Sequence, residues 1–312
     1  MKAVIAHKFG GPEVLKLEDV PVPEPKNGEI LIEVRAVSVN PVDFKMRSGK
    51  FGRGKVTLPV TLGRDVAGTV KKIGAGVDRV QVGEEVYAFL SELSGGYAQY
   101  ALAKSNEVAP KRSSLDYVEA AAVPLAAITA WQGLFDHGSL QAGQTVLIHG
   151  ASGGVGLFAI QFAKNKGATV IATAGPDHID VLREMGADQA IDHKNEKFED
   201  KAKNVDLVLD LIGGETQDRS WQTLRKGGIL VSTLGEPPAE KAIEYDVTAK
   251  GFMAQPKTEQ LVEIGRLIDA GTVKVVISKT FPLAQVAAAH EELEKNHTSG
   301  KIVLLVPEAA AA

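Results

Sequence analysis

The residues best suited to bind a charged ligand lie in a glycine-rich segment near the middle of the chain. A β-branched run at residues 145–149 breaks at Gly150, and apolar residues at helical spacing follow between Val155 and Ala163. A second β-branched run occupies residues 169–173. Strand, glycine turn, helix and strand in this order are typical of a dinucleotide-binding βαβ unit, although glycine turns also serve packing alone. We therefore predict nucleotide binding here, with a purely structural turn as the alternative.

The order of residues in the turn indicates how it would hold a pyrophosphate. Its core contains Gly153 and Gly156, and Ala151 stands where the usual fingerprint has its first glycine. Because Gly153 has no Cβ, a phosphate can approach the backbone, and the N–H groups and dipole of the following helix then stabilise its charge. The residues expected to contact the cofactor in this turn are Gly150, Ala151, Gly153, Gly154, Val155 and Gly156.

The composition of the 312-residue chain excludes several other kinds of chemistry. It contains no cysteine, which excludes disulfides, thiolate metal sites and cysteine nucleophiles. The net charge of −4 gives no reason to expect a nucleic-acid or membrane partner. The longest apolar run, residues 120–131, is interrupted by Pro124 and is shorter than the ~20 residues of a membrane span. With no signal-peptide core at the N-terminus, we expect a cytoplasmic protein.

Two kinds of element must position the glycine turn and its surroundings. Short β-rich runs separated by glycine and proline fill the first third of the chain and predict a compact β-barrel-like domain. These runs are residues 1–6, 13–20, 29–39, 66–74, 84–90 and 97–104. An alanine-rich helical stretch, residues 117–137, then leads into strands that alternate with helices and predict a parallel, doubly wound sheet. The strands expected in that sheet are residues 145–149, 169–173, 190–191, 205–209 and 229–233.

The last part of the chain returns to β structure. Strands are expected at residues 273–277 and 302–306, around an alanine-rich helix at 283–296. This pattern predicts that the tail rejoins the first domain. We expect a catalytic domain at 1–120, a nucleotide-binding domain at 121–268 and a return to the catalytic domain at 269–312.

In this order of motifs the chain resembles the medium-chain dehydrogenase/reductase superfamily, and within it the zinc-free quinone oxidoreductase (zeta-crystallin-like) group. The segments that carry the resemblance are MKAVIAHKFGGPEVLKLEDVPVPEP, SVNPVDFKMRSG, LGRDVAGTVKKIGAGV, GGYAQY, AAVPLAAITAWQGL, HGASGGVG and GKIVLLV. The resemblance implies an α/β fold with a GroES-like β-barrel catalytic domain and a doubly wound Rossmann domain. It also implies NAD(P)H-dependent reduction of quinones or activated alkenes, and suggests a homodimer.

The chain departs from the zinc-dependent members of this superfamily at the metal site. Those relatives have a Cys where this chain has Asn40, and His and Glu where it has Arg64 and Asp65. Their third ligand, another Cys, falls near Leu125, and their structural zinc lobe is missing. Because an Asn, an Arg and a Leu cannot form a tetrahedral zinc site, we expect no metal.

Three residues are the expected catalytic groups. Asn40, which the resemblance places in the active site, could bond a ribose, the nicotinamide or a substrate carbonyl, or could form a turn before Pro41. Lys45 could polarise a carbonyl or be a solvated surface residue. Arg64, with Asp65, could act on substrate or make structural bonds. All three are candidates to stabilise the oxyanion that develops during hydride transfer.

The remaining expected cofactor contacts concern the choice of cofactor. An acid that would bind a ribose 2′-hydroxyl is missing after Thr173, which favours NADPH. His178 or His193 could hold the 2′-phosphate, although each could equally be a surface histidine. Lys301 could reach the pyrophosphate. Two more residues are expected near the cofactor, Thr129 near the nicotinamide and phosphates, and Leu234 in a loop bordering the nicotinamide.

The leading hypothesis is hydride transfer from NADPH to a quinone or an α,β-unsaturated carbonyl. No residue stands out as a general acid, so water could supply the one proton that completes the reduction. Two alternatives remain open on the same scaffold. One is an enoyl-thioester reductase, for which the sequence shows no basic entrance to hold a carrier phosphate. The other is a non-catalytic NADPH-binding redox sensor.

Overall fold

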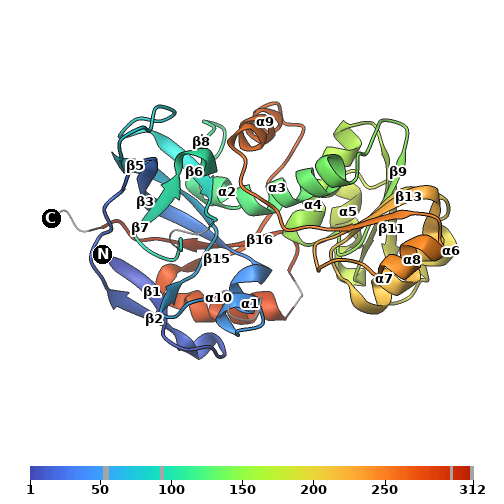
Figure 1. Cartoon of the computed structure of the whole chain (residues 1–312), viewed down its shortest axis with the longest axis horizontal. Helices are drawn as coiled ribbons and strands as arrows, with labels where there is room; N and C mark the ends of the chain where they lie inside the picture. The colour runs from blue at the N-terminus through green and yellow to red at the C-terminus, as the bar shows by residue number, and fades with distance from the viewer. Residues whose placement is uncertain (52–55, 92–94, 296–297, 310–312) are drawn as a thin grey trace. The chain divides into compact units, whose positions relative to one another are not determined.

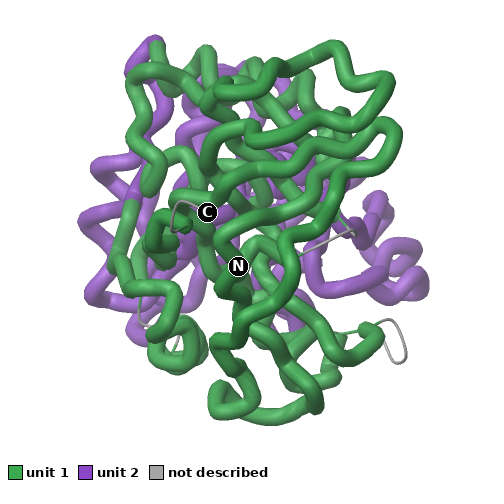
Figure 2. Tube along the Cα trace, turned by 90° about the vertical axis from the view of Figure 1, so that its left-hand side faces the viewer, with its two compact units in different colours: residues 1–125, 256–269, 277–312 green, residues 126–255, 270–276 purple. Residues whose placement is uncertain are grey.

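The computed structural model describes residues 1–51, 56–91, 95–295 and 298–309. The chain forms two compact units, coloured separately in Figure 2. Unit 1 consists of Met1–Leu125, Pro256–Asp269 and Ile277–Ala312, and unit 2 of Ala126–Gln255 and Ala270–Val276. The division expected from the sequence, with boundaries at 120 and 268, differs from these units at residues 121–125, 256–268 and 270–276.

Unit 2 is built on a six-stranded parallel sheet. Its strands are β9 (Thr145–Ile148), β10 (Thr169–Ala174), β11 (Gln189–Asp192), β12 (Val205–Asp210), β13 (Leu224–Ser232) and β14 (Thr248–Gly251). They lie in the order β11-β10-β9-β12-β13-β14, and every neighbouring pair is parallel. This is the Rossmann order, in which the strand order reverses beside the first strand and ligands bind beyond the strand ends. The expected doubly wound sheet is confirmed, and β14 is an addition to it.

Short helices connect the strands of unit 2. They are α4 (Gly154–Asn165), α5 (Ile179–Glu184), α6 (Phe198–Lys201), α7 (Gly214–Ser220) and α8 (Ala239–Glu244). Helices α4 and α5 pack on the strands β9, β10 and β11 (Figure 1). Helix α4 ends as the sequence predicts, because Gly167 has φ +86° and its N–H donates to the Lys164 carbonyl at 2.9 Å.

The helical stretch expected at residues 117–137 is divided into three pieces. They are α2 (Tyr117–Ala121), α3 (Pro124–Trp131) and a π-helical turn, Gln132–His137. Pro124 begins α3, because it lacks an N–H and disfavours helical backbone in the residue before it. The helical character expected for residues 117–137 is confirmed, with a break before Pro124.

Unit 1 contains two sheets. Its strands are β1 (Lys2–Ala6), β2 (Leu15–Asp19), β3 (Glu29–Val39), β4 (Val60–Thr61), β5 (Asp65–Ile73), β6 (Glu85–Phe89), β7 (Tyr100–Lys104), β8 (Val108–Pro110), β15 (Ile277–Pro282) and β16 (Lys301–Leu305). The larger sheet has the order β15-β16-β3-β5-β6-β8, with β7 also paired to β3, and the smaller one has β2-β1-β4. Strand β16 pairs antiparallel with β3, so the tail of the chain contributes a strand to the larger sheet of unit 1.

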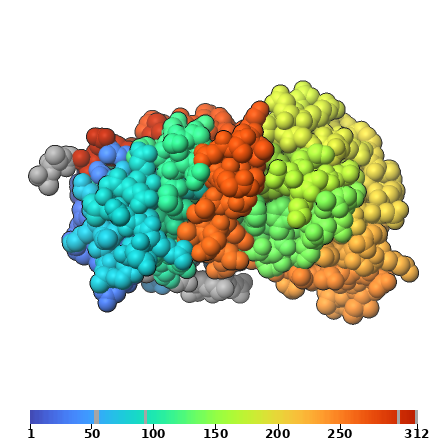
Figure 3. Space-filling view, turned by 90° about the horizontal axis from the view of Figure 1, so that it is seen from above, coloured from blue at the N-terminus to red at the C-terminus, as the bar shows by residue number. Residues whose placement is uncertain are grey.

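In the described part of unit 1, four helices are present in addition to the start of α3. They are α1 (Pro41–Arg47), α2, α9 (Thr258–Asp269) and α10 (Val286–Glu294). Helix α9, which the sequence reading did not identify, lies beside β8 (Figure 3), and Thr258 Oγ1 donates to the Val108 carbonyl at 3.1 Å. The helix expected at 283–296 starts with a 3₁₀ turn at Leu283–Gln285 before α10, and Asn296 lies outside the described residues.

The strand expected at residues 273–277 was placed too early. Strand β15 begins only at Ile277, and the preceding residues belong to unit 2. There the side-chain amide of Gln161 on α4 bonds both backbone groups of Lys274, as a neighbouring strand would. It accepts from Lys274 N at 2.7 Å and donates to Lys274 O at 3.1 Å. Val273 is buried, although it lies outside any strand.

Candidate active site

The glycine turn of unit 2 forms an open helix N-terminus. Gly150 follows β9 with φ +66°, and Ala151 N donates to the Thr173 carbonyl at 3.0 Å. A Cβ on Gly156 would lie 2.5 Å from the Cα of Ala151, so only glycine allows this close packing. Gly153 is the N-cap of α4, and no side chain caps the helix. Its first N–H groups are therefore available to an anion, which fits the pyrophosphate of a dinucleotide.

The end of β10 lies beside this turn and carries no acid. Thr173 is 3% exposed, and its hydroxyl bonds to His149 Nδ1 at 3.0 Å. His149 Nε2 in turn lies 2.9 Å from Ser220 Oγ, which donates to the Thr216 carbonyl. Burial lowers the pKa of His149 to about 4, so this histidine is neutral at physiological pH. The hydrogen bonds from Thr173 to His149 and from His149 to Ser220 thus connect the end of β10, the residue after β9 and α7. The backbone carbonyl of Thr173 accepts the bond from Ala151 N in the glycine turn.

Two histidines flank the corner that follows β10. His193 is exposed, and its backbone N–H donates to the Ala174 carbonyl at 3.1 Å. His178 is half-buried in the 3₁₀ turn after Gly175, and a Cβ on Gly175 would lie 4.0 Å from the His178 ring. Two acids lie near this corner along the chain. Asp177 is exposed, and Asp192, which pairs with Ala174 in the sheet, is half-buried and accepts from Lys194 N and Asn195 Nδ2.

The loops after β12, β13 and β14 present large apolar side chains to solvent. Ile212 is 52% exposed, Leu234 is 47% exposed and Met253 is 60% exposed. A Cβ on Gly150 would lie 2.9 Å from Ile212, so the loop after β12 adjoins the glycine turn, and one on Gly213 would lie 3.4 Å from Leu234, so the loop after β13 adjoins the loop after β12. Exposed apolar side chains at the ligand-binding edge of a doubly wound sheet suit a flat aromatic ring.

Asp210 holds the first of these loops in place. Its buried carboxylate accepts bonds from Ile212 N (3.0 Å), Gly213 N (2.8 Å), Gln217 Nε2 (2.7 Å) and Ser232 Oγ (2.9 Å). Gly213 and Gly214 have φ +74° and +55°, which other residues rarely adopt. The conformation of the loop that carries Ile212 is therefore fixed by the hydrogen bonds to Asp210 and by the two glycines that follow Ile212.

In unit 1 the expected catalytic residue Asn40 is buried in a polar cluster at the ends of three neighbouring strands. Asn40 Nδ2 donates to Asp65 Oδ2 at 2.8 Å, and Lys301 Nζ donates to Asn40 Oδ1 at 2.5 Å. Ser38 Oγ also donates to Asp65 Oδ2 at 2.5 Å, while Leu125 N donates to Asp65 Oδ1 at 2.6 Å. The side chain of Asn40 therefore serves this cluster, and the two-way choice made for Asp65 is decided in favour of structural bonds.

A second buried polar chain runs from Asp43 on α1 to α10. The Asp43 carboxylate accepts from Asn40 N at 2.8 Å, from Gly63 N at 3.2 Å and from Tyr97 Oη at 3.0 Å. Tyr97 Oη lies 3.0 Å from His290 Nε2. On the other side of the ring, Arg47 Nη1 lies 3.1 Å from His290 Nδ1. Because arginine can only donate, His290 Nδ1 accepts and Nε2 carries the hydrogen that points to Tyr97.

Burial has the largest effect on the pKa values of the side chains that connect Asp43 to α10. It raises the pKa of Asp43 to about 6, although the Asn40 backbone N–H and the Arg64 charge act in the opposite direction. Burial also lowers the pKa of His290 to about 3 and raises that of Tyr97 well above its ordinary value. Sequence reasoning did not single out His290, since a histidine in an alanine-rich helix gives no signal of a buried partner.

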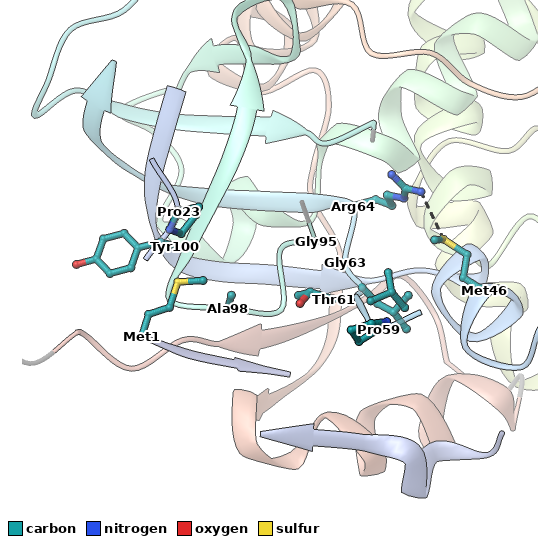
Figure 4. A pocket seen from close by; sticks show the side chains of 12 residues that line it. Met1, Pro23, Met46, Pro59, Thr61, Gly63, Arg64, Gly95, Ala98 and Tyr100 are labelled. Carbon is teal, nitrogen blue, oxygen red and sulfur yellow. Dashed lines mark hydrogen bonds between the residues drawn. The ribbon is translucent and has the colours of Figure 1, made fainter. Parts of the chain in front are cut away.

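Arg64 and Lys45 are more accessible. Arg64 Nη1 donates to the carbonyls of Leu90 and Ser91, and Nη2 lies 3.4 Å from the sulfur of Met46, a weak acceptor. Arg64 and Met46 line one end of a pocket of about 280 Å³, whose wall also includes Thr61 (Figure 4). Lys45 is half-buried on α1. Among the described residues, no group of three His, Cys, Asp or Glu side chains could hold a metal ion.

The two other expected cofactor residues also have defined places. Thr129 lies on α3 and is 7% exposed. The ammonium of Lys301 is bonded inside unit 1, and its side chain is 5% exposed. A contact between Lys301 and a pyrophosphate would therefore require the side chain to leave Asn40.

Comparison with known proteins agrees with this geometry. Residues 26–113 match the alcohol dehydrogenase GroES-like domain and residues 185–304 match the zinc-binding dehydrogenase family. A quinone oxidoreductase from Rattus norvegicus is 37% identical, over 97% of this chain and 96% of the relative. The chloroplastic NADPH-dependent alkenal/one oxidoreductase from Arabidopsis thaliana is 38% identical, over 97% of this chain and 79% of the relative.

A solved structure extends the similarity to the fold. The quinone oxidoreductase of Escherichia coli, complexed with NADPH, has a TM-score of 0.90 and 29% identity, over 98% of this chain and all of that one (100%). The chain belongs to the medium-chain dehydrogenase/reductase superfamily, within its zinc-free quinone oxidoreductase, or zeta-crystallin-like, group. In the part of the chain that the structure describes, no helix is long and apolar enough to cross a membrane.

Proposed function

We propose that this protein is a zinc-independent, NADPH-dependent oxidoreductase that transfers hydride to quinones or α,β-unsaturated carbonyls. The observation that carries the proposal is the open N-terminus of α4 beside a β10 end without an acid. The names of the relatives, quinone oxidoreductase and NADPH-dependent alkenal/one oxidoreductase, support the same activity. NADPH would supply the hydride, and the protein would supply binding, orientation and electrostatics.

Unit 2 provides the residues for cofactor binding. The first N–H groups of α4 would hold the pyrophosphate, and His178 and His193 would hold the 2′-phosphate at the corner after β10. Ile212 and Leu234 would support the nicotinamide ring through their exposed apolar surfaces. Thr173 would act through its backbone, since its hydroxyl is bonded to His149.

Unit 1 provides the groups that would stabilise negative charge on the acceptor oxygen. Among the described residues, the acceptor of Arg64 Nη2 is the weakly accepting sulfur of Met46, which leaves strong donor capacity for a carbonyl or oxyanion. Asn40 Nδ2 has one short bond to Asp65 and a long one of 3.4 Å to Ser38 Oγ, so its second N–H is weakly held. We assign Arg64 and this N–H as the main donors, with Lys45 as a further cation on α1. Water would supply the proton that completes the reduction.

The test is oxidation of NADPH, followed through its near-ultraviolet absorbance, with an ortho-quinone and separately with a short alkenal. Turnover with either acceptor supports the proposal and identifies the preferred class. The same assay with NADH should be much slower, because NADH lacks the 2′-phosphate. Saturable binding of NADPH without turnover of either acceptor, or of an enoyl thioester, would support a binding or sensing role instead. The homodimer and the cytoplasmic location stay predictions, and light scattering checks the first.

A further inference from the structure

The position of Lys301 follows from the strand register of unit 1. Strand β16 pairs with β3 so that Ile302 faces Val39, and the same register places Lys301 opposite Asn40. Strand β5 pairs with the other side of β3 so that Asp65 faces Ser38. The ends of three adjacent strands therefore bring the ammonium, the carboxamide and the carboxylate together. This arrangement is built into the sheet and does not depend on a loop.

The hydrogen bonds determine how the Asn40 amide is oriented. The Asp65 carboxylate can only accept, so the NH₂ group of Asn40 must face it, and the carbonyl oxygen must face Lys301. Lys301 Nζ is surrounded by three acceptors, Asn40 Oδ1 at 2.5 Å, the Val39 carbonyl at 3.4 Å and Asp65 Oδ2 at 3.5 Å. Three acceptors match the three hydrogens of an ammonium, whereas a neutral amine would direct a lone pair at one of them.

We propose that Lys301 is a positioning residue, whose ammonium fixes and polarises the Asn40 carboxamide and so strengthens the N–H that Asn40 offers to the bound ligand. A cation on a carbonyl oxygen withdraws electron density from the amide nitrogen, which makes its N–H groups better donors. Without the ammonium, the buried oxygens of Asn40 and Asp65 would lose a charged partner, and the amide could rotate. The inference rests on the proposed function, because it assigns Lys301 a role in that reaction.

The experiment compares Lys301→Ala with Lys301→Met. Alanine leaves a cavity in which a small amine can bind, whereas methionine fills the same space without a charge. The matched control is Lys279→Met on the neighbouring strand β15, since Lys279 is exposed and pairs with Glu292 at the surface. We expect kcat to fall roughly 10- to 100-fold in both Lys301 variants, the usual cost of removing a supporting partner. The KM for NADPH should change little, and the control should keep its activity.

Added methylamine or ammonium should restore kcat in Lys301→Ala but not in Lys301→Met, and tetramethylammonium, which has no N–H, should restore neither. Methylamine should also raise the Tm of Lys301→Ala, a readout that needs no turnover. If the alanine variant folds poorly, refolding it in methylamine provides the same test. Wild-type kcat in Lys301→Met, or equal recovery with sodium chloride, would overturn the inference. A wild-type protein without turnover would instead refute the proposed function, while the Tm measurement would still test the ammonium site.

Discussion

Acidification should destabilise unit 2 through one residue, His149. This side chain is fully buried between Thr173 and Ser220, and burial lowers its pKa to about 4, from 6.5 in the unfolded chain. Between these two values the unfolded chain binds more protons than the folded one, so stability rises with pH. The contribution of neutral His149 is therefore fully present above about pH 6.5 and is lost progressively as the pH falls towards 4.

The size of the effect follows from the two pKa values. The full difference of 2.5 units, 6.5 minus 4, corresponds to about 3 kcal/mol. Between about pH 7 and about pH 5, most of that range is crossed, and the expected loss is about 2 kcal/mol. Replacing His149 with glutamine keeps a neutral group that can bond Ser220 but leaves Thr173 without its acceptor, at a cost of about 1 kcal/mol. The variant should therefore be less stable than wild type at neutral pH and lose less stability in acid.

Tryptophan fluorescence can follow unit 2 directly. The chain has two tryptophans, Trp131 and Trp221, and both lie in unit 2. Urea titrations of wild type and His149→Gln at the two pH values give four unfolding free energies. The difference of differences cancels contributions from other groups, including His290 of unit 1, whose pKa burial lowers to about 3. Equal losses of stability in wild type and variant would refute the assignment of His149 as a buried neutral group.

Three further perturbations test the cofactor and acceptor sites. Gly156→Ala should abolish tight NADPH binding, measured by calorimetry, because its Cβ would lie 2.5 Å from backbone in the turn; unchanged affinity would contradict the phosphate site. The double variant His178→Gln with His193→Gln should weaken NADPH roughly 10-fold and leave NADH unaffected, and an equal loss for both cofactors would exclude a 2′-phosphate contact. Arg64→Met should lower kcat/KM for the acceptor roughly 10²-fold without changing the Kd of NADPH, whereas the matched surface variant Arg79→Met should not.

Local patterns in the sequence were sufficient to predict the cofactor turn. Each step there is short-range: a strand ends at Gly150, glycine permits the tight turn, and a helix starts with uncapped N–H groups and ends at Gly167. The same holds for the β-rich first third and the alternating strands of unit 2, because period-2 and period-3.6 patterns reflect burial of adjacent residues. Local signals failed at residues 273–276, where the Gln161 side chain bonds the Lys274 backbone and no strand forms.

The roles of single polar residues needed the tertiary structure. Asn40, Asp65 and Lys301 each read as possible ligand contacts, yet strand pairing brings residues 261 positions apart within hydrogen-bonding distance of each other. Likewise, the Thr173 hydroxyl is bonded to His149 inside the protein, whereas from the sequence alone it could have contacted a ribose. No local pattern encodes such partners, since a buried polar group is satisfied by whichever chain segment the fold places beside it.

The sequence by itself thus determined the class of fold, the glycine-rich turn before α4 and the lack of cysteine, because these depend on residue identity and on neighbours along the chain. Only the tertiary structure decided which polar groups are engaged inside the protein and which keep donors for a ligand. The physical reason is that hydrogen bonding and burial of a side chain depend on contacts made across strands and helices, which the β3–β5–β16 register and the packing of α10 establish.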